Sequence, residues 1–480
     1  MTESECLHES KETEGNFEWE REKLKEQSKI AVGGRLNFFW KEWRAIGASK
    51  KIARWLCHGY RLPFGPDGEQ EARGFMKSTC PKDLIPSYPK DSVKGKALRE
   101  MMDVLLEKEV IEKVPEGELC FFNVVFLRPK PNGKWRLILD VSKLNKFLVV
   151  KKFKMDTSQV IRDALVPNLW ASSIDFSDAY HHIPIHKNYR CFLAFQIGEV
   201  TYRYCACPFG LSPLPQVFTE VCMVVKVFAR EQWKCVVFQY IDDWLFVSED
   251  RKKTNDVTRL FVRLCIRLGL VVNLEKSQLV ATQQLVHLGV LWNFKDATLR
   301  PTDDKIESIS KLATQVKTVR RSTLQSLESL MGKMISVEKF IPWARLHYRV
   351  YQRNLLKELR YGRVFRWVKL PECVNVDLNW WSVKENLSKW VPCCPKLADL
   401  VIHTDASRTG WGVSCDRWQF GDTWSQLDLD DHINVLEMRA VEILLQMKGE
   451  ELKDKVLCLR IDNLSVVYYL RKMGGHVHRD

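Results

Sequence analysis

Two adjacent aspartates are the residues of this chain best suited to chemistry. Asp242 and Asp243 lie in the stretch CVVFQYIDDWLFV, residues 235–247, between two short runs of residues that favour β-strands. Strands so close in sequence form a hairpin, which would place both acids at its tip. Neighbouring carboxylates repel each other, and a divalent cation would remove that repulsion. The alternative interpretation is a solvated acidic turn without an ion.

A third acid favours the metal site over the solvated turn. Asp175 follows a strand-like run that ends at Ile174, in the stretch WASSIDFSDAYHHIPI of residues 170–185. An aspartate at a strand end and an aspartate pair on a hairpin can meet as one carboxylate cluster. Such a cluster suits two Mg²⁺ ions about 4 Å apart, which clamp the attacking and leaving oxygens of a phosphoryl transfer.

These residues resemble conserved motifs of reverse transcriptases. Residues 240–243 are similar to the Tyr-x-Asp-Asp motif of that family, and IDFSDAYHHIPI is similar to its first catalytic motif. The stretches CPFGLSPLPQVF (207–218), NLEKSQLV (273–280) and HLGVLW (287–292) resemble its template-and-substrate motif, lysine motif and primer grip. Each motif alone is a weak signal, but all of them in the family's order make the resemblance specific.

The resemblance implies which residues hold the metal ions. Asp175, Asp242 and Asp243 would be the catalytic ligands of two Mg²⁺ ions, with Mn²⁺ as the alternative ion, and the Phe176 carbonyl would assist. It also implies residues that contact the substrate. Tyr180 would be the ring that excludes a ribose 2′-hydroxyl, and Lys276 would donate a proton or contact phosphate. The nucleotide site would be lined by Phe209 and Gly210.

A basic hairpin would carry the nucleotide triphosphate. Two β-type runs, Val124–Leu127 and Trp135–Leu139, flank a Pro-Asn-Gly turn signal. KWRLILDVSKLN resembles the fingers motif of the family, so Arg136 would pair with phosphate oxygens through its planar guanidinium. Lys130 or Lys134 would share the triphosphate, and the residues leave open which one. A solvated basic edge is the alternative interpretation of this hairpin.

Length and composition bound the possible functions. At 480 residues the chain is long enough for two to four domains, and its net charge of +14 favours a polyanionic partner. The 15 cysteines form no CxxC pair and no zinc-type spacing, which favours reduced thiols in an intracellular protein. Without a secretion signal or a transmembrane-length apolar run, we expect a protein of the cytoplasm or nucleus that binds no membrane.

The elements that must position these residues fall into six expected segments. Aromatic residues alternate with basic ones over residues 35–64, which favours helices that pack on the polymerase over a direct nucleic-acid contact. The helical, basic text after Pro301 resembles a thumb that grips duplex phosphates. The segments are a disordered acidic tail (1–32), an N-terminal extension and linker (33–93), fingers and palm (94–297), a helical thumb (298–370), a connector (371–397) and a partial RNase H-like domain (398–480).

Three acids of the last segment predict a second metal site. Asp405 ends an apolar strand, Glu437 lies on an amphipathic helix, and Asp462 ends a second strand. The segment resembles the RNase H fold, which implies that the three acids are metal ligands. Because only eighteen residues follow Asp462, we expect the domain to lack its last strand and helix. It would then cleave hybrid RNA weakly or not at all.

The expected fold is therefore α+β, with a right-hand polymerase of fingers, palm and helical thumb followed by a truncated α/β RNase H-like domain. GGRLNFFWKEW, HGYRLPF and HINVLEMRAVEILL most resemble the DIRS group of tyrosine-recombinase retrotransposons. The resemblance implies that the chain is an RNA-directed DNA polymerase. Its partners would be an RNA template, a DNA primer, the RNA–DNA hybrid and dNTPs. The oligomeric state stays open.

Two other functions are kept as alternatives. One is a catalytically decayed, element-derived protein that only binds nucleic acid, and the intact aspartate triad argues against it. The other is an RNA-templated RNA polymerase, which shares the palm acids. Tyr180 and the RNase H-like segment argue against that alternative, because neither is needed to make RNA.

Overall fold

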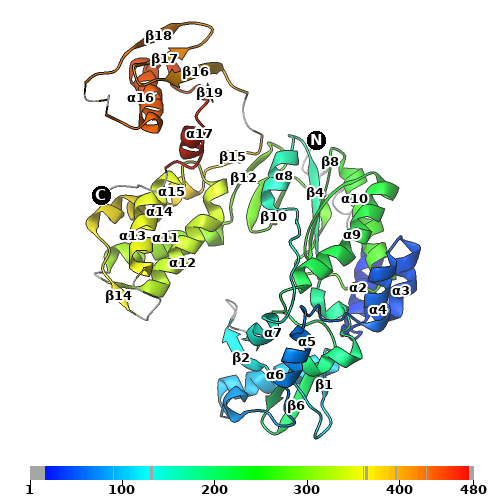
Figure 1. The fold of residues 1–480 in the computed structure, drawn as a ribbon. Coiled ribbons are helices and arrows are strands. Elements are labelled where there is room, and N and C mark those ends of the chain that lie inside the picture. Colours follow the sequence, from blue (N-terminus) through cyan, green and yellow to red (C-terminus); the bar gives the residue numbers. More distant parts are fainter. Residues whose placement is uncertain are drawn as a thin grey trace. The chain divides into compact units, whose positions relative to one another are not determined.

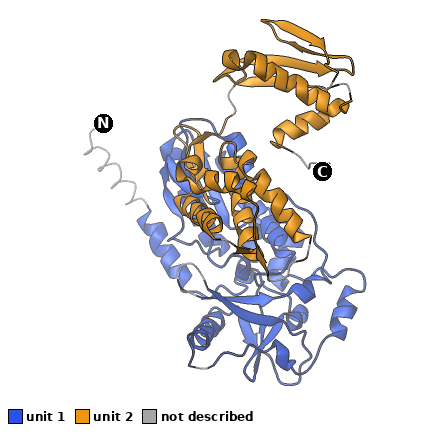
Figure 2. Cartoon of the chain, turned by 90° about the vertical axis from the view of Figure 1, so that its left-hand side faces the viewer, with its two compact units in different colours: residues 1–288 blue, residues 289–480 orange. Residues whose placement is uncertain are grey.

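The computed structural model describes residues 17–474, apart from residues 90, 130–132, 134, 320, 361, 363–365, 395–396, 427 and 429. The chain divides into two compact units, residues 1–288 and residues 289–480. Figure 1 labels the helices and strands, and Figure 2 colours the two units. Helices and sheets mix in both units, as expected for an α+β protein. None of the described helices has the length and apolarity needed to cross a membrane.

A four-stranded antiparallel sheet at the centre of the first unit carries the predicted catalytic acids. Its strand order is β7-β8-β4-β9, and β4 and β8 are almost wholly buried. Two long helices pack against it, and the second ends at Gly269, as its sequence predicts. The elements are β4 (Trp170–Asp175), β7 (Val236–Tyr240), β8 (Asp243–Ser248), β9 (Gln278–Thr282), α9 (Leu214–Trp233) and α10 (Arg251–Leu268).

The segment expected to form the fingers contains the predicted basic hairpin and a small second sheet. The hairpin pairs β2 (Val124–Pro129) with β3 (Trp135–Asp140), and the second sheet has the order β1-β6-β5. Its strands are β1 (Ile111–Lys113), β5 (Ala194–Ile197) and β6 (Val200–Tyr204). Short helices connect these parts, namely α6 (Val93–Glu107), α7 (Ser142–Asn145), α8 (Ser158–Ala164), η2 (Ala179–His182) and η3 (Lys187–Leu193).

Residues 17–32 correct the expectation of a disordered tail. Helix α2 (Glu18–Ser28) packs on α10, and Phe17 and Leu24 are buried in the same core as the palm. Glu20 is fully buried and its Oε1 accepts a hydrogen bond from Arg263 at 2.7 Å. Residues 1–16 lie outside the described part of the chain.

The rest of the N-terminal extension also packs on the palm. Helices α3 (Leu36–Ala45) and α4 (Lys50–His58) pack against each other, and α3 contacts α10. The fully buried Trp43 donates from Nε1 to the Leu268 carbonyl at 3.0 Å. The expected linker further along contains α5 (Gly68–Gly74) and η1 (Lys82–Leu84), so it is partly helical rather than extended throughout.

The second unit begins with a helical bundle that is larger than the expected thumb. Residues 371–392 are not a connector, because α14 packs on α11 and Trp381 is fully buried in the bundle core. The helices are α11 (Asp303–Thr318), α12 (Leu324–Val337), α13 (Arg349–Leu359), α14 (Asn375–Ser382), α15 (Lys384–Leu387), η4 (Glu338–Phe340), η5 (Leu346–Tyr348) and η6 (Glu372–Val374).

Short strands accompany this bundle. Strand β13 (Ser322–Thr323) pairs with β14 (Trp367–Val368). Strand β12 (Thr298–Pro301) pairs with β11 (Val290–Asn293) on one side and with β15 (Val391–Pro392) on the other. The pairing with β15 ties the expected connector to the start of the bundle. A further strand, β10 (Gln284–His287), precedes residue 288.

The last segment forms a four-stranded sheet of order β18-β17-β16-β19 with helix α16 (Ile433–Leu452) packed on β16. Strands β16 (Leu400–Ala406), β17 (Gly410–Ser414) and β18 (Gln419–Thr423) are antiparallel neighbours. Strand β19 (Leu457–Arg460) returns parallel to β16 after the helix, and α17 (Leu464–Arg471) follows. This arrangement agrees with the α/β fold expected from the sequence.

Candidate active site

Strand pairing brings the three predicted palm acids together. Asp175 is the last residue of β4 and lies opposite Asp243, the first residue of β8. Tyr240 also pairs with Asp243, so Ile241 and Asp242 form the turn between β7 and β8. The prediction that the aspartate pair lies at a hairpin tip is therefore confirmed. Asp175 Oδ1 lies 3.5 Å from Lys276 Nζ, which brings the predicted lysine to the same edge of the sheet.

The turn that carries Asp242 has an unusual backbone. Ile241 has a φ of 55°, a conformation that a β-branched residue rarely adopts. Two contacts fix the turn: the Phe176 N–H donates to the Asp242 carbonyl at 3.3 Å, and Gln239 Nε2 donates to the Ile241 carbonyl at 3.4 Å. Strained residues of this kind persist where the surrounding structure holds them, and they are frequent at functional sites.

The electrostatics of the three acids fit a cation site. Burial, together with the charges of Asp242 and Asp175, raises the pKa of Asp243 to about 7. Burial is also the main cause that raises the pKa of Asp242. Asp175 Oδ1 is buried, with the Lys276 ammonium group 3.5 Å away as its ion-pair partner. Carboxylates that repel one another in this way are hard oxygen ligands, and Mg²⁺ or Mn²⁺ would supply the missing positive charge.

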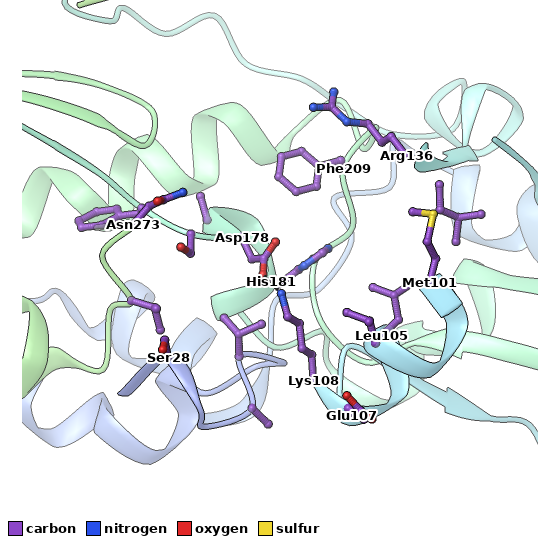
Figure 3. Close-up of a pocket in the computed structure, with 18 of the residues that line it drawn as sticks. Ser28, Met101, Leu105, Glu107, Lys108, Arg136, Asp178, His181, Phe209 and Asn273 are labelled. Carbon is purple, nitrogen blue, oxygen red and sulfur yellow. Dashed lines mark hydrogen bonds and ion pairs between the residues drawn. The ribbon is translucent and has the colours of Figure 1, made fainter. Parts of the chain in front are cut away.

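A cleft of about 1360 Å³ is lined by Asp242, one of the three palm acids, and by residues of the basic hairpin such as Arg136 (Figure 3). Most of the predicted substrate residues line it, and Gly210 approaches the fingers closely, since a Cβ there would stand 3.1 Å from the Leu139 carbonyl oxygen. The predicted residues that line the cleft are Arg136, Phe176, Phe209, Gly210, Asp242 and Lys276. Lys130 and Lys134 lie outside the described residues.

Arg136 has a like-charged partner on the fingers hairpin. Arg128 lies directly opposite it in the register of β2 and β3. Like charges placed opposite each other on a sheet destabilise it, and an anion between them would reverse that effect. This arrangement supports a phosphate-binding role for the hairpin.

Tyr180 is almost wholly buried and does not line the cleft directly. Its ring packs against that of Phe209 with the centroids 4.8 Å apart, and against Phe218 at 5.6 Å. Phe209 is half exposed and lines the cleft. The predicted sugar-excluding ring therefore supports a second ring at the surface of the site.

Sequence reasoning missed one ion pair in the cleft and the N-terminal loop beside it. Lys108 Nζ lies 2.5 Å from Asp178 Oδ2, and both residues line the cleft together with residues 28–32. Asp178 belongs to the first catalytic motif, so its position was visible in the sequence. Lys108 follows a helix of ordinary amphipathic pattern, which gave no signal of a site.

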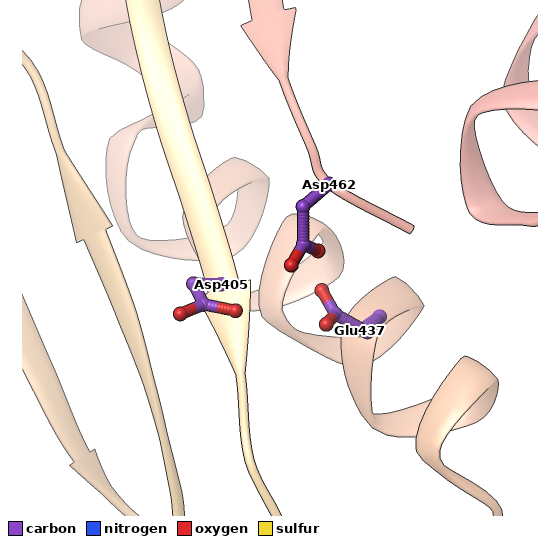
Figure 4. Close-up of side chains that lie close together, drawn as sticks. All are labelled: Asp405, Glu437 and Asp462. Carbon is purple, nitrogen blue, oxygen red and sulfur yellow. The ribbon is translucent and has the colours of Figure 1, made fainter. Parts of the chain in front are cut away.

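A second carboxylate cluster lies in the last segment, where the sequence predicted it. Asp405, Glu437 and Asp462 have ligand oxygens within 4.8 Å of one another (Figure 4). Burial, followed by the charges of Asp462 and Asp405, raises the pKa of Glu437, and its Oε2 has no hydrogen-bond partner among the described residues. Three oxygen ligands at this spacing fit a divalent cation.

The sequence of the segment that carries the palm acids is similar to a known protein family. Residues 128–292 match the family model described as reverse transcriptase (RNA-dependent DNA polymerase), and the match includes Arg136, both palm acid motifs and Lys276. This part of the chain is therefore similar to a reverse transcriptase domain. This agrees with the resemblance of the motifs, whereas no comparison bears on the DIRS grouping.

Relatives of the reverse transcriptase domain occur in retroviruses and transposons. The Gag-Pol polyprotein of walleye dermal sarcoma virus is 23% identical over 284 residues, which cover 59% of this chain and 16% of that protein. The Pol polyprotein from transposon 412 of Drosophila melanogaster is 26% identical over 236 residues, covering 48% and 18% respectively. The chain spans about half, or less, of the length of the curated relatives that it matches.

Solved structures support the polymerase fold. A foamy viral protease-reverse transcriptase in complex with dsDNA has a TM-score of 0.53 and 17% identity, over 92% of each chain. The same kind of protein in complex with an RNA/DNA hybrid has a TM-score of 0.54 and 17% identity, over 90% of this chain and 58% of that one. At this identity the likeness establishes the fold, and it confirms the expected α+β polymerase class.

Proposed function

We propose that this chain is the RNA-directed DNA polymerase of a retroelement. The observation that carries the proposal is the pairing of Asp175 with Asp243, beside Asp242, at the edge of a cleft that also contains Arg136. Its partners would be an RNA template, a DNA primer, the resulting hybrid and dNTPs. The net charge of +14 and the basic helical bundle support binding to such polyanions.

The residues of the cleft divide the work of nucleotidyl transfer. Asp175, Asp242 and Asp243, with the Phe176 carbonyl, would hold two Mg²⁺ or Mn²⁺ ions. When bound, such ions activate the primer 3′-hydroxyl and stabilise the charge of the leaving pyrophosphate. Arg136 would bind phosphate oxygens, assisted by Lys130 or Lys134.

Lys276 would complete the site on the palm side. Its side chain is two-thirds exposed and lies 3.5 Å from Asp175, so it can reach a phosphate or donate a proton to the pyrophosphate. Template pairing supplies the sequence specificity, so the protein needs contacts to the backbone rather than to base edges.

Primer extension tests this proposal against its alternatives. The assay offers an RNA template with a DNA primer, Mg²⁺, and either dNTPs or rNTPs. Extension with dNTPs is the expected result. Extension with rNTPs alone would favour an RNA polymerase, and binding of the duplex without extension would favour a decayed element.

Tyr180→Val is expected to raise the use of rNTPs relative to dNTPs. The Tyr180 ring supports Phe209, so its loss opens space where the ribose 2′-hydroxyl would lie. The ratio of kcat/KM for rNTP and dNTP measures the effect, and Phe209→Val is the companion variant. An unchanged ratio in both variants would show that neither ring selects the sugar.

We propose further that the element belongs to the DIRS group. The support is the resemblance of the motifs GGRLNFFWKEW, HGYRLPF and HINVLEMRAVEILL to that group.

We also propose the domain boundaries. Residues 33–93 are an N-terminal extension and linker, residues 94–297 are fingers and palm, and residues 298–370 are a thumb. The packing of α14 adds residues 375–382 to that thumb.

The second carboxylate cluster supports a second candidate function, metal-dependent hydrolysis of hybrid RNA. Only three carboxylates meet there among the described residues, so we expect any cleavage to be weak. Asp405→Asn should lose one bound Mn²⁺ and any cleavage of a labelled RNA–DNA hybrid.

A Mn²⁺ titration followed by electron paramagnetic resonance, in a background with Asp242 and Asp243 replaced by asparagine, isolates this cluster. Asp416→Asn, an exposed acid that is not a member of the cluster, is the control. Equal Mn²⁺ binding by the Asp405 and Asp416 variants would contradict the assignment.

A further inference from the structure

A lysine from the fingers side shares the cleft with the palm acids. Lys108 directly follows the last residue of α6, and its ammonium group meets the Asp178 carboxylate at 2.5 Å (Figure 3). The side chains of Lys108 and Asp178 are 43% and 33% exposed. Both line the cleft that contains Asp242 and Arg136, so a ligand in the cleft can reach the pair.

The N-terminal extension fixes the main chain of Lys108. The Lys108 carbonyl accepts a hydrogen bond from the Gly33 N–H at 2.8 Å. The next residue, Gly34, donates its N–H to the His181 carbonyl at 2.7 Å. A Cβ at Gly33 would stand 2.0 Å from the Glu109 carbonyl oxygen, so only glycine allows this approach. Since its carbonyl is held by Gly33 and its N–H donates to the Val104 carbonyl at 3.0 Å, Lys108 can change partner by moving its side chain alone.

Basic side chains in the cleft offer contacts to an anionic ligand, although acidic side chains line it as well. The Asp178 carboxylate is the ion-pair partner of the Lys108 ammonium group, at 2.5 Å. Lys29, Lys276 and Arg136 line the same cleft. The acids Glu100, Glu107 and Asp242 line it too, so an anion would be bound by individual basic groups rather than by a net positive charge of the cleft. A triphosphate offers several charged oxygens where Asp178 offers one carboxylate, so it can compete for the ammonium group.

We propose that Lys108 binds the triphosphate of the incoming nucleotide, and that Asp178 holds this side chain while the cleft is empty and releases it to the phosphates. The inference rests on the proposed polymerase function. A purely structural ion pair, which only fastens α6 to the palm, is the competing explanation. If the pair is purely structural, loss of either side chain should have the same effect on nucleotide binding. If Lys108 binds phosphate, loss of Lys108 should weaken nucleotide binding, whereas loss of Asp178 should not.

Steady-state extension of a DNA primer on an RNA template separates the two explanations. Lys108→Met should raise KM for dNTP about 10-fold, with a similar loss of inhibition by inorganic pyrophosphate, because a charge-assisted hydrogen bond is removed. Asp178→Asn should leave KM unchanged or lower it and strengthen pyrophosphate inhibition, because the ammonium group is then free. Asparagine tolerates the φ of 50° at this position. Lys108→Arg should restore most of the affinity.

Lys96→Met is the matched control, because it removes the same charge from α6, the helix that Lys108 follows, at an exposed position that does not line the cleft. Similar increases of KM in Lys108→Met and Asp178→Asn would overturn the inference in favour of a structural pair. A wild-type chain that extends no primer would instead contradict the proposed function. Thermal unfolding of each variant separates a loss of fold from a loss of nucleotide binding.

Discussion

Replacing Asp242 with asparagine is expected to abolish primer extension, with a loss of several orders of magnitude in rate. Asparagine keeps the shape of the side chain but removes a negatively charged oxygen ligand from the palm cluster. Single-nucleotide extension with dNTPs and Mg²⁺, on an RNA template with a DNA primer, measures the effect. Equal activity of the two proteins would contradict the assignment of Asp242 as a metal ligand.

The Asp242→Asn variant should lose activity without losing stability. Because burial raises the pKa of Asp242, its ionised form is disfavoured in the folded protein, and a neutral amide removes that cost above the raised pKa. In EDTA at neutral pH, Asp242→Asn should therefore unfold at the same temperature as the wild type or higher. Asp250→Asn is the control, since asparagine also serves well at this helix N-cap and the site lies outside the cluster.

Replacing Trp43 with alanine is expected to destabilise the first unit by about 3–5 kcal/mol. Trp43 is fully buried in the core that also contains Trp244 and Phe261 of the palm, and its Nε1 bonds to the Leu268 carbonyl. The variant loses both the buried ring and this hydrogen bond. Chemical denaturation of the metal-free protein, followed by circular dichroism, measures the change in the free energy of unfolding.

Phe38→Ala provides the internal control for this prediction. Phe38 lies on the same helix, α3, but its side chain is 80% exposed, so its loss should change stability by no more than about 0.5 kcal/mol. Equal denaturation midpoints for the two alanine variants would mean that the N-terminal helices add little to the stability of the palm.

The palm site was predictable because its signals are local in the sequence. Alternating and β-branched residues mark the strands, and the acids follow directly at their ends, so the position of Asp175 and the Asp242 turn could be inferred without knowing the fold. The pairing of β4 with β8 then follows from the need to bury both strands. The positive φ at Ile241 could not be inferred, because a β-branched residue is the least expected choice there.

The parts that sequence reasoning misjudged owe their structure to distant partners. Helix α2 is rich in charge and was interpreted as a disordered tail, but Glu20 bonds to Arg263, more than 200 residues away. Likewise, residues 371–397 were expected to be a connector, although Trp381 is buried in the core of the bundle. Short amphipathic helices gain most of their stability from such packing, which their own residues do not reveal.

The bond between Trp43 and Leu268 joins residues 225 positions apart, and this separation sets a delay during synthesis. At about 5–20 residues per second, a ribosome needs roughly 10–45 s to add the residues between them. During that time α3, with Trp43 on it, has been made without the helix α10 that packs against it. Nascent chains that stop before residue 268 should therefore remain bound to chaperones, whereas chains that include α10 should dissociate from them.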